Sequence, residues 1–222
     1  MLNSRLQACA DLITPGARVC DVGTDHAQLA VYLLEGGIAE DVIASDIGEG
    51  PLQAAQRTIS AHGLDGCIRT ILSDGLESIP PEGLTHIVIA GMGGETIIHI
   101  LESCPFPLDQ TTLILQPMTK ARELRKWLYC SGFALAREVC IRDDRYLYAV
   151  MQAQYTGERI GSDPVRECLG ALDLSLPESQ DYADRVYAQL CKARDGRRNA
   201  GQPDEPFASE AEMIRDRMEE FR

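Results

Sequence analysis

The chain has 222 residues, with 21 Lys and Arg against 34 Asp and Glu, so its formal net charge is −13. Hydrophobic residues make up 45% of the chain and charged residues 25%, which excludes a disordered or fibrous protein. No run approaches the roughly 18 apolar residues of a membrane span. The polar N-terminal segment also lacks the apolar core of a signal peptide. We therefore expect a soluble, cytoplasmic protein.

The first part of the chain alternates between strand-like and helix-like segments. We predict strands at 18–22, 41–45, 68–73, 85–90 and 111–115. We predict helices between and after them, at 27–35, 51–62, 95–103 and 120–131. Several of these helices stop next to Gly or Pro, which is typical of helix ends. Alternation of this kind indicates an α/β fold with a doubly wound parallel sheet.

The next two segments, 133–142 and 145–154, have an extended pattern and are joined by Asp143 and Asp144. They favour an antiparallel hairpin at one edge of the sheet. We place the end of this body at residue 155 and treat 156–222 as a second domain, because the strand pattern stops there.

Helical periodicity dominates this second domain. Apolar residues recur at steps of three and four, in two series separated by the turn-rich segment 201–206. The residues are Ala183, Val186, Leu190, Ala193, Phe207, Ala211, Ile214, Met218 and Phe221. Two helices folded back on each other would satisfy the pattern, either as a protruding coiled-coil hairpin or as a plain helical cap on the body.

Eight cysteines and four histidines raise the question of a zinc site or of disulfides. No two cysteines have the C-x-x-C spacing, and no histidine lies at ligand spacing from a cysteine. Disulfide frameworks belong to small secreted chains. We therefore expect no metal, and reduced cysteines that pack as small apolar residues in the core.

The most informative loop follows the first predicted strand. This strand ends in Asp21, and the chain then turns through Gly23 into a helix. In doubly wound sheets, an adenosine-containing cofactor lies at this first turn. The next strand ends in Asp46, at roughly the 20-residue offset at which a carboxylate binds ribose hydroxyls.

Charge distinguishes between the cofactors that this loop could bind. A dinucleotide places its pyrophosphate against several glycines, but Asp25 and Gln28 occupy the later glycine positions of the G-x-G-x-x-G pattern. A carboxylate there repels phosphate and attracts the sulfonium and ammonium groups of S-adenosylmethionine. The loop therefore predicts a methyl donor rather than NAD.

Two further strands end in residues that suit the same ligand. Asp74 can accept a hydrogen bond from the adenine amino group, and Gly75 lets the base approach the backbone. The following strand ends in three glycines and Met92, of which Gly91 and Met92 can shape a pocket for the target base. All of these residues fall at the carboxyl edge of the sheet, where open α/β folds hold ligands.

Five motifs of this kind follow one another over roughly the first 150 residues. They are Asp-Val-Gly-Thr-Asp-His at 21–26, Ala-Ser-Asp-Ile-Gly-Glu-Gly-Pro at 44–51, Ser-Asp-Gly-Leu at 73–76, Ile-Ala-Gly-Met-Gly-Gly at 89–94 and Leu-Ile-Leu-Gln-Pro-Met at 113–118. In this order they resemble the TrmK family, the bacterial tRNA (adenine(22)-N1)-methyltransferases. The resemblance implies a class I, Rossmann-like methyltransferase domain, a coiled-coil-like helical domain, S-adenosylmethionine as cofactor and tRNA as partner.

The motifs and the resemblance together give a set of cofactor-binding candidates at the carboxyl edge. They are Asp21, Gly23, Thr24, Asp25, Asp46, Ile47, Asp74, Gly75, Gly91 and Met92. Asp25 is also the first catalytic candidate, with His26 as its hydrogen-bond partner, because methylation leaves a positive charge on the base that a carboxylate stabilises. The alternative for Asp25 is that it binds only the amino group of the cofactor.

The candidates for binding RNA are mostly basic, although the net charge of −13 is unfavourable for a tRNA enzyme. They are Gln28, Gln116, Lys120, Arg122, Arg125, Lys126, Arg197 and Arg198. Gln28 and Ala30 stand where the family usually has an aromatic residue and a proline, which leaves the substrate preference open. The alternatives are a methyltransferase for a small molecule or another RNA, and a non-catalytic scaffold that binds the cofactor. We expect a monomer or a weak oligomer.

Overall fold

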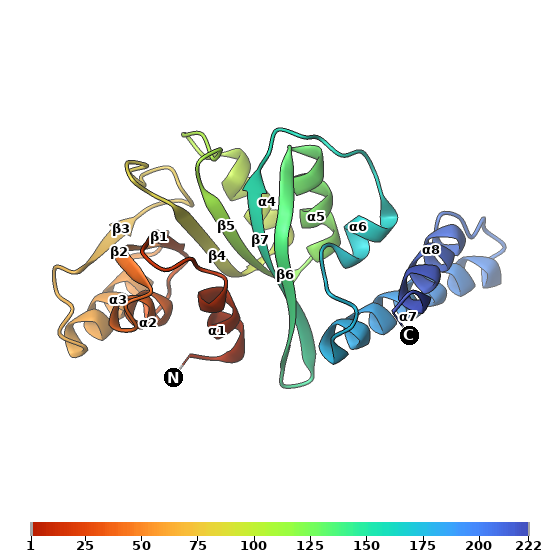
Figure 1. Cartoon of the computed structure of the whole chain (residues 1–222), viewed down its shortest axis with the longest axis horizontal. Helices are drawn as coiled ribbons and strands as arrows, with labels where there is room; N and C mark the ends of the chain where they lie inside the picture. The colour runs from red at the N-terminus through yellow and green to blue at the C-terminus, as the bar shows by residue number, and fades with distance from the viewer. Residues whose placement is uncertain (1, 222) are drawn as a thin grey trace.

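In the computed structural model, which describes residues 2–221, seven strands form one sheet. The strands are β1 (Ala17–Val22), β2 (Ala39–Asp46), β3 (Ile68–Leu72), β4 (His86–Gly93), β5 (Thr112–Thr119), β6 (Phe133–Asp143) and β7 (Tyr146–Tyr155). Their order is β3-β2-β1-β4-β5-β7-β6 (Figure 1). The first five strands are parallel, whereas β7 runs antiparallel to both β5 and β6. The strand order reverses direction between β1 and β4, which is where doubly wound sheets bind ligands.

Helices cover both faces of the sheet. They are α1 (Ser4–Asp11), α2 (Gln28–Glu35), α3 (Glu49–Ala61), α4 (Gly94–Glu102) and α5 (Ala121–Cys130). Buried residues of α1, α2 and α3 pack in one cluster with Val19 and Val88, whereas those of α4 and α5 pack in another with Cys20 and Ile87. Successive strand residues face opposite sides of a sheet. Both sides are apolar here, which explains the continuous hydrophobic runs of these strands.

The tail consists of α6 (Pro164–Leu169), α7 (Pro177–Asn199) and α8 (Phe207–Glu219). The long helices α7 and α8 lie side by side and project beyond the sheet, with α6 between them and the body (Figure 1). The tail has its own apolar cluster, which includes Ala183, Leu190 and Ile214 from the predicted series. The predicted pair of helices is confirmed. The heptad geometry of a coiled coil and the domain boundary after residue 155 stay predictions.

The hairpin of β6 and β7 contacts both the N-terminal helix α1 and the helix α7 of the tail. Its tip lies between α1 and α7 (Figure 1), where Asp143 binds Ser4 and Arg5 of α1, and the neighbouring Arg142 binds Asp181 of α7. The predicted antiparallel hairpin at one edge of the sheet is confirmed.

The predicted elements of the body agree with the structure in order and type, but several strands run further than expected, including β4 and β5 at their carboxyl ends. Bulges between Ala90 and Gly93 let β4 continue to Gly93, alongside a β5 that continues to Thr119. Two helices were not predicted: α1, whose Asn3 cap accepts a hydrogen bond from the backbone of Leu6, and the short helix α6.

All eight cysteines are free, but the expectation that they lie in the core is only partly right. Three are buried, namely Cys9, Cys20 and Cys168. Cys67 and Cys130 are exposed, so the expectation is wrong for these two. Within residues 2–221, no group of His, Cys, Asp and Glu side chains could hold a metal ion, and no helix is long and apolar enough to cross a membrane.

Candidate active site

The predicted acids end adjacent strands at the carboxyl edge of the sheet. Val22 at the end of β1 pairs with Ser45 of β2, and Asp46 pairs with Leu72 of β3. This register brings Asp21 and Asp46 close enough for the charge of Asp46 to raise the pKa of Asp21. Asp74 follows two residues after the end of β3 and is exposed. The structure therefore places three carboxylates along one edge, as the sequence predicts.

Asp21 is the buried member of this row, with 4% of its surface exposed. Burial raises the pKa of its carboxyl from 3.8 to about 6, although a hydrogen bond from the Thr24 hydroxyl to Oδ2, at 2.7 Å, opposes the shift. Among the described residues, no other side chain donates a hydrogen bond to this carboxylate. A buried carboxylate with a single donor is a favourable partner for a cation, because the pair lowers the cost of burying its charge.

The first loop holds this acid by a tight backbone turn. The backbone N–H groups of Gly23 and Thr24 both donate to the carbonyl oxygen of Ser45, at 2.8 and 2.9 Å. Gly23 has a φ of 75°, and a Cβ there would lie 2.2 Å from Cε of Met92. The positive φ favours glycine at this position, whereas the methyl group of Met92, at the end of a flexible side chain, could move aside.

The next residues of the loop adopt an uncommon backbone conformation. Asp25 and Ala27 have φ values of 51° and 54°, in the left-handed region that residues other than glycine seldom occupy. Helix α2 therefore begins at Gln28, one residue later than expected. Backbone strain of this kind concentrates at functional sites. Here it turns the side chains of Asp25 and His26 outward, where both are more than half exposed and His26 Nε2 lies 3.7 Å from Asp25 Oδ1.

A cavity of about 460 Å³, which we call the rim cavity, opens beside this loop. Its walls come from α1, the first loop, the start of α2 and the ends of β4 and β5. They consist of Asn3, Arg5, Leu6, Asp21, Gly23, Thr24, Asp25, His26, Gln28, Leu29, Ala90, Gly91 and Met118. Seven of the predicted site residues thus line one cavity. Five cofactor candidates lie outside its walls on the same edge: Asp46, Ile47, Asp74, Gly75 and Met92.

The candidates outside the rim cavity have geometry of their own. Oδ1 of Asp46 accepts a hydrogen bond from the backbone of Gly48, at 2.9 Å. Ile47 is 68% exposed, an unusual position for a large apolar side chain. Gly75 has a φ of 53°, and a Cβ there would lie 2.9 Å from Ile100, so this position also favours glycine. Their roles in binding the cofactor stay predictions.

Arg5, which is not among the predicted site residues, reaches the rim cavity from α1. Its Nε lies 3.0 Å from Asp143 Oδ2, and its Nη1 lies 3.3 Å from Gln116 Oε1 and 3.2 Å from the sulfur of Met118. The guanidinium also lies over the ring of Tyr148, 5.7 Å from its centroid. These contacts join segments more than 100 residues apart, so no local signal in the sequence could have shown them.

The environment of Gln116 differs from the exposed position that the predicted contact with RNA requires. Gln116 is completely buried: Oε1 accepts hydrogen bonds from Gly91 N–H at 3.1 Å and from Arg5, while Nε2 donates to the carbonyl of Pro117 at 3.0 Å. The prediction that it contacts RNA is wrong, because both ends of its amide are engaged inside the protein. Gln116 instead fixes Gly91 and Arg5 at the cavity wall.

Comparison with known proteins identifies the family to which the chain belongs. A family model described as a methyltransferase domain matches residues 2–151. The tRNA (adenine(22)-N(1))-methyltransferase of Bacillus subtilis (strain 168) is 33% identical over 213 residues, which cover 89% of each chain. The crystal structure of the B. subtilis m1A22 tRNA methyltransferase TrmK matches with a TM-score of 0.79 at 31% identity, covering 99% of this chain and 96% of that one. The chain belongs to the TrmK family.

A second relative has been solved with the donor bound. The structure of Streptococcus pneumoniae Sp1610 in complex with S-adenosyl-L-methionine has a TM-score of 0.83 at 28% identity and covers 98% of this chain and 100% of that one. Membership of the TrmK family confirms the resemblance that the five motifs indicated. It also confirms the predicted Rossmann-like methyltransferase fold.

The two departures from the usual TrmK motif occupy different environments. Gln28 is exposed and lines the rim cavity, so its side chain is available to a substrate. Ala30 is fully buried on the inner face of α2, in the core. Only the change at Gln28 therefore alters the surface of the site.

Of the predictions that basic residues contact RNA, the one for Arg125 is wrong. Arg125 is completely buried, with Nη2 2.7 Å from Glu138 Oε1 and Nη1 2.8 Å from the carbonyl oxygen of Cys168. A guanidinium enclosed in this way cannot reach a phosphate. It lies on the inner face of α5, whose exposed face carries Lys126.

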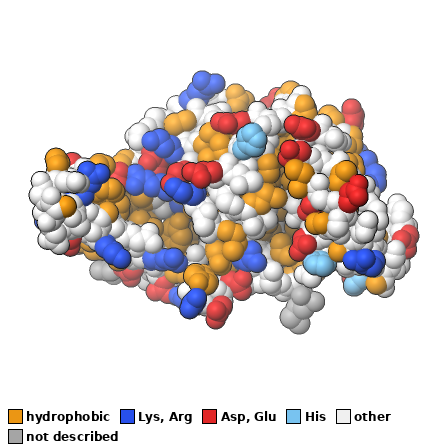
Figure 2. Space-filling view, turned by 180° about the vertical axis from the view of Figure 1, so that it is seen from behind, with side chains coloured by type: hydrophobic (Ala, Val, Ile, Leu, Met, Phe, Trp, Pro, Cys, Tyr) orange, Lys and Arg blue, Asp and Glu red, His pale blue; other side chains and the backbone are white. Residues whose placement is uncertain are grey.

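The other basic candidates remain at or near the surface. Arg122 is half-buried and binds Glu210 at 2.7 Å and Glu167 at 3.1 Å, whereas Lys120 lies 3.1 Å from Glu123. In the tail, Arg197 lies over the ring of Phe207 and Arg198 binds Asp204. On the face shown in Figure 2, Lys and Arg side chains are interspersed with Asp and Glu and form no continuous basic stripe. Their contacts with RNA stay predictions.

Proposed function

We propose that the protein transfers the methyl group of S-adenosylmethionine to N1 of adenine 22 in tRNA. The observation that carries the proposal is the rim cavity, which is lined by both the acidic first loop and Gly91. The chain that forms this cavity is 33% identical, over 89% of its length, to a relative named for that reaction. The catalytic candidates Asp25 and His26 line this cavity.

The residues of the carboxyl edge fit the methyl donor. Asp21 is a buried carboxylate whose described hydrogen bonds leave room for the donor's ammonium group. Asp46 and Asp74, further along the same edge, would accept hydrogen bonds from the ribose and the adenine. Ile47, an exposed apolar side chain beside Asp46, would cover the adenine ring. When bound, S-adenosylmethionine supplies an electrophilic methyl group on a sulfonium.

The chain's own contribution to the reaction is chiefly orientation. The N1 atom of adenine is unprotonated at neutral pH, so it needs no strong base, and catalysis rests on holding it in line with the methyl group. The target base must be unpaired or extruded, because pairing and stacking bury N1. The wall formed by Gly91, held by Gln116, and by Met118 would position the base.

Asp25 supplies the electrostatic contribution to catalysis. Alkylation at N1 leaves a positive charge on the ring, and a carboxylate at the mouth of the cavity stabilises that charge and can accept a proton from N6 afterwards. His26 Nε2 lies 3.7 Å from Asp25 Oδ1, beyond hydrogen-bond distance, and would orient the carboxylate if the two side chains approach more closely when substrate binds.

The test is to incubate the protein with isotopically labelled S-adenosylmethionine and unmodified bulk tRNA, and then to digest the tRNA and identify the labelled nucleoside. We expect 1-methyladenosine, together with a reverse-transcription stop at position 22, because methylation of N1 blocks base pairing. A tRNA with guanosine at position 22 is the matched control and should stay unlabelled. Absence of 1-methyladenosine from the wild-type reaction would contradict the proposal.

A second candidate is methylation of a small molecule or of another RNA. The net charge of −13 and the exposed Gln28 in the rim cavity favour it, because tRNA enzymes usually rely on basic surfaces and aromatic stacking. Label recovered in metabolites rather than in tRNA, when the same protein is incubated with a cell extract, would select this candidate.

A further inference from the structure

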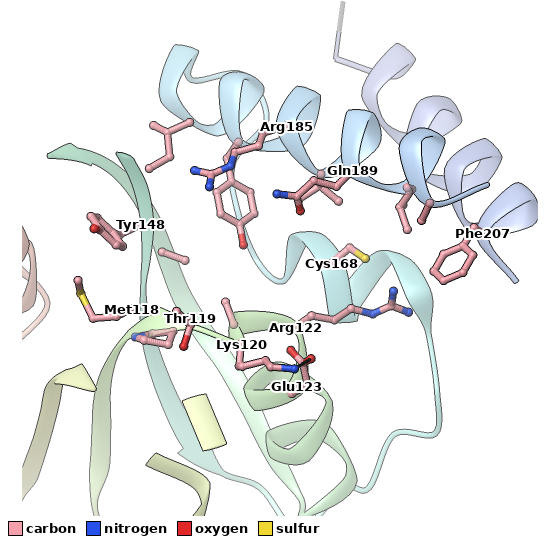
Figure 3. Close-up of a pocket in the computed structure, with 18 residues that line it drawn as sticks. Met118, Thr119, Lys120, Arg122, Glu123, Tyr148, Cys168, Arg185, Gln189 and Phe207 are labelled. Carbon is pink, nitrogen blue, oxygen red and sulfur yellow. Dashed lines mark hydrogen bonds and ion pairs between the residues drawn. The ribbon is translucent and has the colours of Figure 1, made fainter. Parts of the chain in front are cut away.

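A second cavity of about 390 Å³ lies between the body and the tail (Figure 3). We call it the α7 cavity. One wall is the turn from β5 into α5 and the first residues of β7, and the other is the face of α7, closed at one end by Phe207 of α8. Its volume falls within the range of sites for small ligands.

Two polar side chains of this cavity lack partners. Arg185 and Gln189 extend from α7 toward the cavity (Figure 3), and neither side chain forms a hydrogen bond or an ion pair within residues 2–221. They lie four residues apart, so they share one face of the helix. The other cations of the lining, Lys120 and Arg122, are paired with glutamates. Arg185 is thus the unpaired positive charge of the cavity, beside an amide with free donors and a free acceptor.

The α7 cavity adjoins the rim cavity. Met118 lines both of them. Tyr148 lines the α7 cavity, while the guanidinium of Arg5, which lines the rim cavity, lies over the tyrosine ring at 5.7 Å. Met118, the half-buried Tyr148 and the guanidinium of Arg5, which contacts both of them, therefore lie at the boundary between the two cavities. An RNA chain that places one nucleotide in the rim cavity would place the adjacent nucleotide in the α7 cavity.

We propose that the α7 cavity binds the nucleotide adjacent to the target adenosine, with its base against Tyr148 and its phosphate on Arg185. Gln189 hydrogen-bonds an edge of the base. Unpaired RNA is recognised in this way, by stacking on aromatic rings, by cationic contacts with the backbone and by hydrogen bonds to exposed base edges. The inference rests on the proposed function, because it takes the ligand to be the same tRNA strand.

This arrangement gives the tail a specific purpose. The aromatic wall belongs to the body, whereas the cation and the amide belong to α7, so the site exists only when the tail sits against the hairpin. The contact of Arg142 with Asp181 and that of Arg122 with Glu210 hold the tail in that position. The tail would thereby contribute to choosing the sequence around the target, in addition to any general attraction for phosphates.

The experiment is a double-mutant cycle between protein and RNA. Methylation of full-length tRNA is compared with that of two tRNAs that carry an abasic site, one on the 5′ side and one on the 3′ side of the target. Each tRNA is tested with wild-type protein and with Tyr148→Leu. We expect one abasic site and the Tyr148→Leu change each to lower kcat/KM for tRNA by about 5- to 150-fold, which is the range for loss of a base–aromatic stack. The two losses should not add when combined, while KM for S-adenosylmethionine stays unchanged.

Two further variants keep the inference testable if Tyr148→Leu perturbs the half-buried site. Arg185→Gln and Gln189→Ala alter exposed side chains, and each should raise KM for tRNA without changing the melting temperature. Arg185→Gln should also reduce the salt dependence of binding by about one phosphate contact. Arg159→Gln is the matched control, because this exposed arginine lies in the loop after β7, at the end of that strand opposite the hairpin.

The outcomes distinguish failure of this inference from failure of the proposed function. If wild-type protein produces no 1-methyladenosine in intact tRNA, the proposed function fails, and this inference fails with it. If the product forms but both abasic tRNAs lose activity equally with wild type and Tyr148→Leu, and Arg185→Gln behaves as Arg159→Gln does, the α7 cavity is not a nucleotide site and the proposed function stands.

Discussion

Arg125 and Glu138 form an ion pair that is completely enclosed by the protein. Two nitrogens of the guanidinium, Nε and Nη2, lie 2.9 and 2.7 Å from Glu138 Oε1, and neither side chain is exposed. The same guanidinium donates to the backbone carbonyls of Glu167 and Cys168 and to the hydroxyl of Tyr182. It therefore links α5 and β6 of the body to α6 and α7 of the tail.

Replacement of this arginine should destabilise the protein severely. We expect Arg125→Met to lower the free energy of unfolding by about 3–5 kcal/mol, because it leaves the carboxylate of Glu138 buried without a counter-ion. Denaturant titration would measure the loss. Arg166→Met, which removes an exposed arginine 3.4 Å from Asp163, is the control and should cost less than about 1 kcal/mol. Failure of the double change Arg125→Met with Glu138→Leu to recover stability would contradict this account.

The buried carboxyl of Asp21 should make stability depend on pH in a defined direction. Its pKa is raised from 3.8 to about 6 in the folded protein, so the folded state binds more protons than the unfolded state between these values. The free energy of unfolding should consequently fall by about 3 kcal/mol as the pH rises from about 4 to 6. Asp21→Asn should remove this decrease and be more stable than wild type at pH 7. The exposed Asp74→Asn should keep it, and an identical slope in wild type and Asp21→Asn would argue against the shift.

Asp25 offers a choice between a catalytic role and binding of the cofactor alone. Asp25→Asn keeps the shape of the side chain and tolerates the left-handed backbone. If the carboxylate acts on the target base, kcat should fall by about 100-fold or more, with the dissociation constant of S-adenosylmethionine unchanged. Single-turnover kinetics and calorimetry would measure the two quantities. A weaker affinity for the cofactor with an unchanged kcat would instead assign Asp25 to cofactor binding.

The basic end of the tail is expected to attract tRNA electrostatically. Reversal of Arg197 and Arg198 to Glu should weaken tRNA binding and flatten its salt dependence, because fewer counterions are then released. Binding at two salt concentrations would measure both effects. A matched reversal on α8, Arg215→Glu with Arg217→Glu, controls for the change in net charge. Unchanged affinity in the Arg197 and Arg198 variant would remove this end of the tail from the RNA surface.

Much of the body could be read from the sequence because its signals are local. The strand ending in Asp21, the turn at Gly23 and the acid at Asp46 each report a backbone conformation or a strand end within a few residues. Parallel topology then brings such strand ends to one edge, without further information. Helix α1 escaped notice because its main signal is a single capping residue, Asn3, ahead of a short helix.

Roles that depend on burial could not be read in this way. Lys120, Arg122, Arg125 and Lys126 form one basic cluster in the sequence, yet the structure buries Arg125, pairs Arg122 with the tail and leaves the two lysines exposed. Arg125 is enclosed because α6 and α7 of the tail pack against its side of α5. That packing depends on residues 40 or more positions further along the chain.

The sequence by itself determined the fold class, the acidic character of the cofactor loop and the family. Each of these depends on local signals, namely the residues at strand ends and the glycines in the turns that follow them. The tertiary structure alone decided that Arg5 reaches the rim cavity, that Gln116 and Arg125 face inward, and that Tyr148 and Arg185 share a second cavity. The physical reason is distance along the chain: a turn is stabilised by its neighbours, whereas a cavity wall is assembled from side chains that only folding brings together.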